Sequence, residues 1–249
     1  MKTLMRHILN ILASNYLLFF DSTKINYKKI LKKIKMLVKN KKVLDVGCGL
    51  GIFSYEISKY ASFVDAIDID PNVLKCSKKS NNIKYILSSI ENYNVNKKYD
   101  LIICLQVLEH IKNDKYVFKK IVNLLKKGGY ILISTPNKNK FINHNFKIKR
   151  LFKKFFPNVK SCELLKDKPH GHERLGYNKQ DFEFFATENN LKIVDVFYED
   201  SPIIIYEIFF LLPNFLRIFL YPIFSFINKV FTNLNNKDGL SIYILFRKL

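Results

Sequence analysis

The chain has 249 residues, 48% of them hydrophobic, which suits one α/β domain with a decorated end and argues against wholesale disorder. Its formal net charge is +21 and the lysines are spread along the chain, so we attribute the excess to an AT-rich genome rather than to nucleic-acid or membrane binding. The four cysteines form no C-x-x-C pair, which argues against a zinc site and against a disulfide framework.

The first 40 residues are expected to form a helical segment ahead of the main domain at 41–249. Residues 1–20 resemble a signal peptide only weakly, because two asparagines interrupt the apolar stretch and no A-x-A cleavage site follows. We therefore expect a cytoplasmic protein. Residues 24–40 have the pattern of a basic amphipathic helix, whose apolar side comprises Ile30, Leu31, Ile34, Leu37 and Val38.

Strands and helices alternate along the rest of the chain. Buried strands are expected at residues 42–46, 63–69, 85–87, 100–104, 130–134, 191–196 and 241–246. Helices are expected at 52–60, from Pro71 with Asp70 as its cap, at 116–125 with Gly128-Gly129 closing it, and at 181–189. This order predicts a Rossmann-like α/β fold with a doubly wound, mostly parallel, seven-stranded sheet and a C-terminal antiparallel strand.

A glycine-rich turn follows the first expected strand, in the stretch VLDVGCGLG at residues 43–51. A strand that runs into G-x-G-x-G and then a helix is typical of a nucleotide-binding turn, because glycine lets the backbone turn tightly and approach a ligand closely. A dinucleotide site would need a third glycine where Ile52 stands. Asp45 beside the turn would repel a pyrophosphate and attract an ammonium group, which favours S-adenosylmethionine over NAD.

A second acidic residue, Asp68, ends the next expected strand about 20 residues further on, where an acidic side chain accepts hydrogen bonds from ribose hydroxyls. A capping or surface carboxylate is the structural alternative. Asp70 is the better helix cap, so Asp68 is expected to serve the ligand.

Four stretches, VLDVGCGLG, AIDIDP, YDLIICLQVLEHI and LLKKGGYILISTPN, resemble class I S-adenosylmethionine-dependent methyltransferases over roughly residues 40–200. Within that family, LEHI and STPN look most like the ubiquinone-biosynthesis O-methyltransferases and their methyltransferase type 11 relatives. The resemblance implies S-adenosylmethionine as cofactor. It also implies a set of cofactor-binding residues, namely Asp45, Gly47, Cys48, Gly49, Gly51, Asp68, Ile69, Ser89, Ile90 and Leu105.

Two positions depart from the family pattern. Ser89 stands where the adenine-side residue is often acidic, which puts the adenine contact in doubt. Gln106 stands where the quinone enzymes tend to carry glutamate, which weakens the case for quinone chemistry and for a metal near that segment. We therefore expect no metal ligands.

Histidine is the natural candidate for removing a proton from a hydroxyl acceptor, because its pKa lies near neutrality. His110 follows the fourth expected strand, at the sheet edge where open α/β folds bind ligands, and His172 lies in a later loop close to Tyr177. We expect His110 ahead of His172 as the base. A purely packing or anchoring role is about equally consistent with either residue, and a carboxylate or amine acceptor would need no base.

The most apolar stretch of the chain, residues 202–232, is expected to be a helical insertion between the last two strands. Pro213 and Pro222 are expected to break or kink it, and its polar residues fall in a narrow arc. Such a segment either packs on its own domain or a second copy, or lies in the interfacial plane of a membrane. We favour the membrane slightly, as a peripheral contact on the inner face.

The sequence thus predicts a methyltransferase that acts on a small-molecule or lipid-linked acceptor, at oxygen. An RNA methyltransferase is the alternative enzyme, although no N-P-P-Y-type segment follows the fourth strand, so nucleic acid is not the expected partner. A non-catalytic S-adenosylmethionine-binding protein is the alternative from another class. The acceptor and the oligomeric state are left open.

Overall fold

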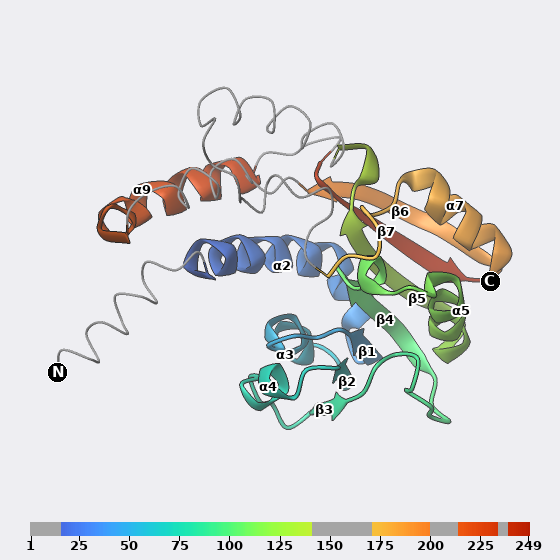
Figure 1. Cartoon of the computed structure of the whole chain (residues 1–249). Helices are drawn as coiled ribbons and strands as arrows, with labels where there is room; N and C mark the ends of the chain where they lie inside the picture. The colour runs from blue at the N-terminus through green and yellow to red at the C-terminus, as the bar shows by residue number, and fades with distance from the viewer. Residues whose placement is uncertain (1–15, 141–170, 200–213, 234–238) are drawn as a thin grey trace.

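The computed structural model describes residues 16–140, 171–199, 214–233 and 239–249. Within these residues the chain forms one seven-stranded sheet in the order β3-β2-β1-β4-β5-β7-β6 (Figure 1). The strands are β1(Lys42–Val46), β2(Phe63–Asp68), β3(Ile83–Leu87), β4(Tyr99–Leu105), β5(Leu125–Pro136), β6(Leu191–Glu199) and β7(Ser241–Lys248).

Strand direction follows the predicted fold class. Neighbours from β3 through β5 pair in parallel, whereas β7 pairs antiparallel with both β5 and β6. Parallel neighbours need crossover connections, which place helices on the faces of the sheet. The prediction of a Rossmann-like, mostly parallel α/β sheet with an antiparallel C-terminal strand is confirmed.

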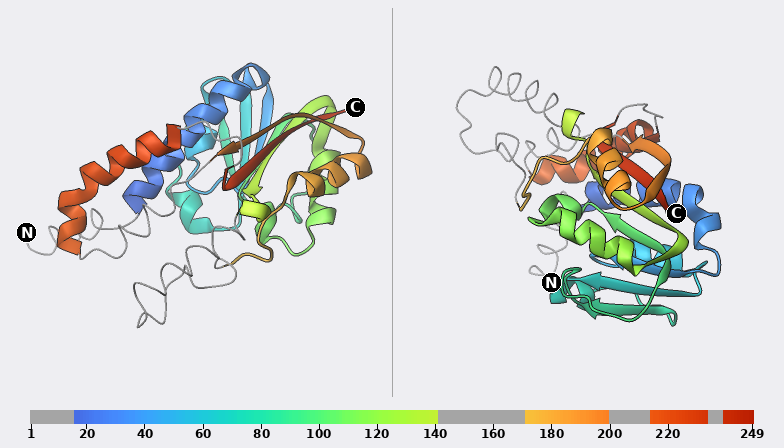
Figure 2. Two further views of the ribbon diagram at one scale, coloured as in Figure 1. Left: turned by 90° about the horizontal axis from the view of Figure 1, so that it is seen from above. Right: turned by 90° about the vertical axis from the view of Figure 1, so that its right-hand side faces the viewer.

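Helices cover both faces of the sheet (Figure 2). On one face, Ile30 and Ile34 pack in the same core as Leu101 and Ile103 of β4, together with residues of α3. On the other face the core includes residues of α5 and α7. The helical segments are α2(Tyr16–Val38), α3(Ile52–Ser58), α4(Pro71–Lys75), the short 3₁₀ helix η1(Leu108–His110), α5(Asp114–Leu124), α7(Lys179–Glu188) and α9(Asn214–Asn233).

The expected apolar side of the first helix faces the sheet. Four of its five predicted residues, Ile30, Leu31, Ile34 and Val38, are buried. The helix already includes Tyr16, so the predicted start at residue 24 is too late. No glycine or proline stands between residues 16 and 24 to end a helix there.

The prediction that Gly128-Gly129 closes a helix is wrong. Helix α5 ends at Leu124, β5 begins at Leu125, and both glycines lie within that strand. A Cβ on Gly129 would lie 3.0 Å from the Asp100 carbonyl oxygen and from the Leu125 side chain. The glycine is therefore needed for close approach between strands, where the pairing of β4 with β5 changes register.

The apolar insertion forms a helix without the predicted break. Helix α9 runs from Asn214 to Asn233 with Pro222 inside it, and it lies along α2 in both views (Figures 1 and 2). Pro222 is exposed, so water can satisfy the carbonyl oxygen that a proline leaves without its helical partner. Pro213 and the rest of 202–213 lie outside the described residues.

Candidate functional site

The turn after β1 has the backbone of a ligand-binding loop. Gly47, Gly49 and Gly51 all have positive φ angles, of 69°, 52° and 65°. The amides of Gly47 and Cys48 donate to the carbonyl oxygen of Ile67, at 2.9 and 3.0 Å, which ties the loop to the end of β2. Glycine adopts these angles at the lowest cost, because it has no Cβ, which explains the three glycines at this spacing.

The three glycines have different surroundings. A Cβ on Gly47 would collide with Val107, and one on Gly51 would collide with Tyr85. A Cβ on Gly49 would meet nothing within 4 Å. The backbone at Gly49 therefore faces open space, as a loop that receives a cofactor requires.

Asp45 is placed beneath the loop. It is 4% exposed, and one carboxylate oxygen accepts a hydrogen bond of 2.5 Å from the Ser54 hydroxyl of α3. Burial is the main reason that its pKa rises to about 6, and the nearby Asp68 also raises it. The Asp45 carboxyl group therefore lies close to the loop. The oxygen that accepts from Ser54 is directed into the protein and not toward the loop.

Asp68 connects the loop to the end of β2. Its Oδ2 accepts from the Gly49 amide at 2.8 Å, and its Oδ1 accepts from the Asp70 amide at 3.0 Å. Each carboxylate oxygen can accept a second hydrogen bond. Asp70 caps α4 through the amide of Asn72, as the sequence predicts, so Asp68 retains acceptor capacity for a ligand.

A cavity of about 410 Å³ lies over this edge of the sheet. It is lined by Val46, Gly47, Ile67, Asp68, Ile69, Ser88, Ser89, Ile90, Glu91, Gln106, Val107, His110, Ile111, Lys112 and Glu173. Five of the predicted cofactor residues therefore line one space together with His110. The other five predicted residues lie in or beside the loop but do not line the cavity, namely Asp45, Cys48, Gly49, Gly51 and Leu105.

Gln106 lines the cavity and has a backbone conformation that the sequence does not reveal. Its φ angle is +56°, and its side-chain amide donates to the Ser134 hydroxyl at 3.2 Å. Left-handed backbone is common for Gly, Asn and Asp, so a glutamine gives no such signal. The residue turns the chain sharply after β4 and directs the following segment across the cavity.

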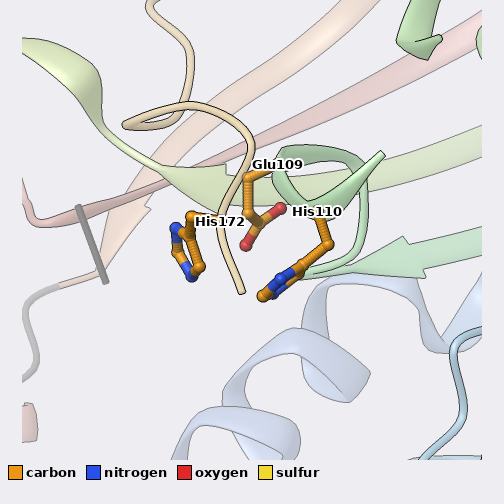
Figure 3. A group of neighbouring side chains, drawn as sticks. All are labelled: Glu109, His110 and His172. Carbon is orange, nitrogen blue, oxygen red and sulfur yellow. The ribbon is translucent and has the colours of Figure 1, made fainter. Parts of the chain in front are cut away.

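The two predicted histidines lie together. The rings of His110 and His172 have centroids 4.4 Å apart and meet edge to face (Figure 3). His110 Nδ1 is 2.8 Å from the carbonyl oxygen of Gly171. The amides of Glu173 and Arg174 donate to the carbonyl oxygen of Glu109, so the loop that carries His172 is fastened to η1.

Glu109 lies between the two rings and was not among the predicted site residues (Figure 3). Its side chain is fully buried, and this burial raises its pKa to about 8. The pKa of His172 is lowered, mainly by burial and also by the neighbouring His110. From the motif L-E-H, the sequence predicts a site role only for the histidine, because nothing in the sequence shows that the glutamate points inward.

Tyr177, the other residue near His172 in the sequence, does not join this cluster. Its hydroxyl donates to Asp114 at 2.7 Å, and it is buried against Phe182 and Phe185. Burial, and then the hydrogen bond to the Asp114 carboxylate, raise the pKa of Tyr177 far above its ordinary value. The geometry indicates a packing role.

Comparison with known proteins places this site in a family. A methyltransferase domain family matches residues 23–157, which is more than half of the chain. Malonyl-[acyl-carrier protein] O-methyltransferase 1 of Ilyobacter polytropus is 37% identical over 124 residues, covering 44% of this chain and 46% of the relative. A ubiquinone biosynthesis O-methyltransferase of Rickettsia bellii is 33% identical over 125 residues, covering 47% and 51%. The chain spans about half the length of the curated relatives it matches.

Solved structures support the fold. The magnesium protoporphyrin IX methyltransferase of Synechocystis PCC 6803 superposes with a TM-score of 0.59 at 14% identity, covering 92% of this chain and 84% of that one. An N-methyltransferase of Bradyrhizobium japonicum WM9 gives 0.56 at 13% identity, covering 91% and 96%. With the family match and the glycine loop, these comparisons show that the chain belongs to the class I S-adenosylmethionine-dependent methyltransferases.

Proposed function

We propose that this protein transfers the methyl group of S-adenosylmethionine to an oxygen atom of a small-molecule, carrier-linked or lipid-linked acceptor. The observation that carries the proposal is the shared cavity, which joins Gly47 and Asp68 on the cofactor side to His110 on the other. The two curated relatives described above are both named as O-methyltransferases, which supports oxygen as the acceptor atom.

The chemistry asks little of the protein beyond positioning. The sulfonium of S-adenosylmethionine is an excellent leaving group, so methyl transfer requires an acceptor oxygen held in line with the S–CH₃ bond. We propose that Gly47, Gly49, Asp68, Ser89 and Ile90 hold the cofactor, with Asp45, Cys48, Gly51, Ile69 and Leu105 shaping its surroundings. A hydroxyl acceptor must also lose its proton, and His110, with His172 beside it, stands where that proton leaves.

Cofactor binding tests the proposal directly. Calorimetry should show binding of S-adenosylmethionine and of S-adenosylhomocysteine and no binding of NAD. Asp68→Ala should weaken binding by about 1–3 kcal/mol, since it removes hydrogen bonds to a charged acceptor. Asp70→Ala is the matched control, because Asp70 caps α4 and does not line the cavity. Binding of NAD without S-adenosylmethionine, or equal losses in the two variants, would contradict the assignment.

We further propose that α9 contacts the surface of an anionic membrane. Phe219, Ile223, Phe226 and Val230 are 77%, 54%, 67% and 45% exposed, and their spacing places them in one stripe along the helix. The neighbouring α2 presents exposed lysines at the same kind of spacing, namely Lys28, Lys32 and Lys35, and Lys39 directly after the helix continues the row. An apolar stripe beside basic residues suits the interface of an anionic bilayer. None of the helices within the described residues is long and apolar enough to cross a membrane.

Flotation with vesicles tests this contact. Wild-type protein should float with phosphatidylglycerol vesicles and less with phosphatidylcholine vesicles. Phe219→Ser/Phe226→Ser should reduce flotation at least about tenfold, because burying each phenylalanine contributes roughly 1.5–3 kcal/mol. Tyr116→Ser is the control, since Tyr116 is 52% exposed on α5, across the sheet. Unchanged flotation of the double variant would contradict the proposal, and a concentration-dependent dimer lost in that variant would assign the stripe to a second copy.

A further inference from the structure

Three side chains that can ligate a cation lie together at the His110 end of the cavity. One ligand atom from each of Glu109, His110 and His172 can be chosen so that all lie within 4.8 Å of one another (Figure 3). Two of the residues are adjacent in sequence and the third comes from a loop far along the chain. The cluster is therefore a product of the fold and not of one local motif.

Glu109 lacks the partners that a buried carboxylate requires. Its side chain is fully buried, and neither oxygen has a hydrogen-bond partner among the described residues. Arg174, whose amide donates to the Glu109 carbonyl oxygen, uses its terminal nitrogens on Asp114 and on the carbonyl oxygens of Ile111 and Lys112. A buried carboxylate without a partner is strongly unfavourable, so Glu109 either keeps a proton or takes a positive group at its oxygens.

Both imidazole rings present a nitrogen suited to ligation. The carbonyl oxygen of Gly171 can only accept, so His110 Nδ1 carries the proton and Nε2 of the neutral ring keeps its lone pair. Histidines that bind metals commonly donate their other nitrogen to a backbone carbonyl in this way. His172 Nδ1 is buried and has no partner among the described residues. The two rings and the carboxylate thus offer three ligand atoms that lie within 4.8 Å of one another.

We propose that Glu109, His110 and His172 bind a divalent transition-metal ion, of which Zn²⁺ is the type. Two imidazoles and one carboxylate favour such an ion over Mg²⁺, which prefers oxygen ligands and water. Binding at about 2.0–2.2 Å from each donor requires the three groups to draw together by small side-chain rotations. This proposal departs from the expectation of no metal ligands, which rests on Gln106 and does not take His172 into account.

Three protein ligands leave the ion with an open coordination position. Because His110 lines the cavity, an ion held there would lie beside the acceptor. On the proposed function, the ion would supply Lewis acidity that helps the acceptor hydroxyl to lose its proton to solvent before the oxygen attacks the methyl carbon. The O–CH₃ bond forms as the S–CH₃ bond breaks, with the electron pair going to sulfur to give S-adenosylhomocysteine. His110 then acts as a ligand of the ion, and the ion promotes the proton loss.

The ion can be detected without any acceptor. Tag-free protein, stripped with a chelator, is titrated with Co²⁺, whose visible absorption reports low-coordinate binding to nitrogen and oxygen. Wild type should bind about one Co²⁺ per chain, and Zn²⁺ should displace it. Glu109→Gln and His172→Ala should each weaken binding at least about 100-fold, since even outer-shell changes cost 10–100-fold. Glu173→Gln, one residue beyond His172 and outside the cluster, should bind Co²⁺ like wild type.

The Co²⁺ titrations distinguish a metal site at Glu109, His110 and His172 from the absence of one. The proposal fails if wild type gives no saturable Co²⁺ spectrum, or if Glu109→Gln and His172→Ala bind Co²⁺ as well as wild type does. Loss of binding in Glu173→Gln with retention in Glu109→Gln would place the ion elsewhere. Calorimetry with S-adenosylhomocysteine on the metal-free protein tests the proposed function separately, because S-adenosylhomocysteine should bind even without the metal ion. Cofactor binding without metal binding would overturn the metal site alone.

Discussion

Replacing Gly49 by valine is expected to abolish binding of S-adenosylmethionine while leaving the fold intact. A Cβ at this position meets no protein atom within 4 Å, so the new side chain does not disturb the core. It fills the space in front of the loop that the cofactor needs. Calorimetry should detect no binding of S-adenosylhomocysteine, and circular dichroism should show wild-type secondary structure.

Gly128→Val is the matched control for this variant. Gly128 also has a positive φ angle, of 74°, and a Cβ there also meets nothing within 4 Å, but the residue lies in β5, outside the glycine loop. Each substitution forces a branched side chain into left-handed backbone, at a cost of roughly 1–2 kcal/mol of stability. The two variants should therefore lose similar stability, and only Gly49→Val should lose the cofactor. Normal cofactor binding by Gly49→Val would show that the loop is not the cofactor site.

Replacing His110 by alanine is expected to lower the maximal rate on a hydroxyl acceptor by ~10²–10⁴-fold with little change in cofactor affinity. His110 lines the cavity beyond the cofactor loop and contacts His172 and the Gly171 carbonyl. Its loss removes the group that we propose promotes departure of the acceptor proton, either as a base or as a ligand of an ion. Steady-state kinetics measures the maximal rate, and calorimetry on the same sample measures the cofactor affinity.

An unchanged rate in His110→Ala would move the catalytic assignment to His172. A fall in cofactor affinity equal to the fall in rate would instead show that His110 helps to hold the cofactor. Thermal melting of the variant supplies the structural control, because the His110 ring is exposed and its removal should cost little stability.

The position of the proposed cofactor residues at one edge of the sheet was predictable because they belong to local motifs. Gly47, Gly49 and Asp68 belong to short contiguous stretches whose order follows from the parallel sheet, so adjacent strand ends bring them to one edge. The mostly parallel sheet and the antiparallel C-terminal strand were predictable because each strand carries its own apolar pattern and the strands alternate with helices.

The acceptor half was only partly predictable because it depends on contacts between distant segments. The sequence suggests His110 and His172 singly, but their contact is created by two amides bonded to the Glu109 carbonyl oxygen. The inward position of Glu109 depends on the short 3₁₀ helix that begins just after Gln106 turns the chain. Backbone conformation of this kind leaves no compositional mark, as the two glycines within β5 also show.

The placement of β7 between β5 and β6 has a consequence for how this chain acquires its fold. Within the described sheet, β6 pairs with no strand except β7, which follows it by about 40 residues, and β5 precedes β7 by more than 100 residues. During synthesis, β6 must therefore wait unpaired until residue 248 has left the ribosome, while β1 to β5 can already assemble. Such long-range closure is intrinsically slow, so deleting β7 should leave a trapped intermediate with an open edge at β5, prone to aggregate.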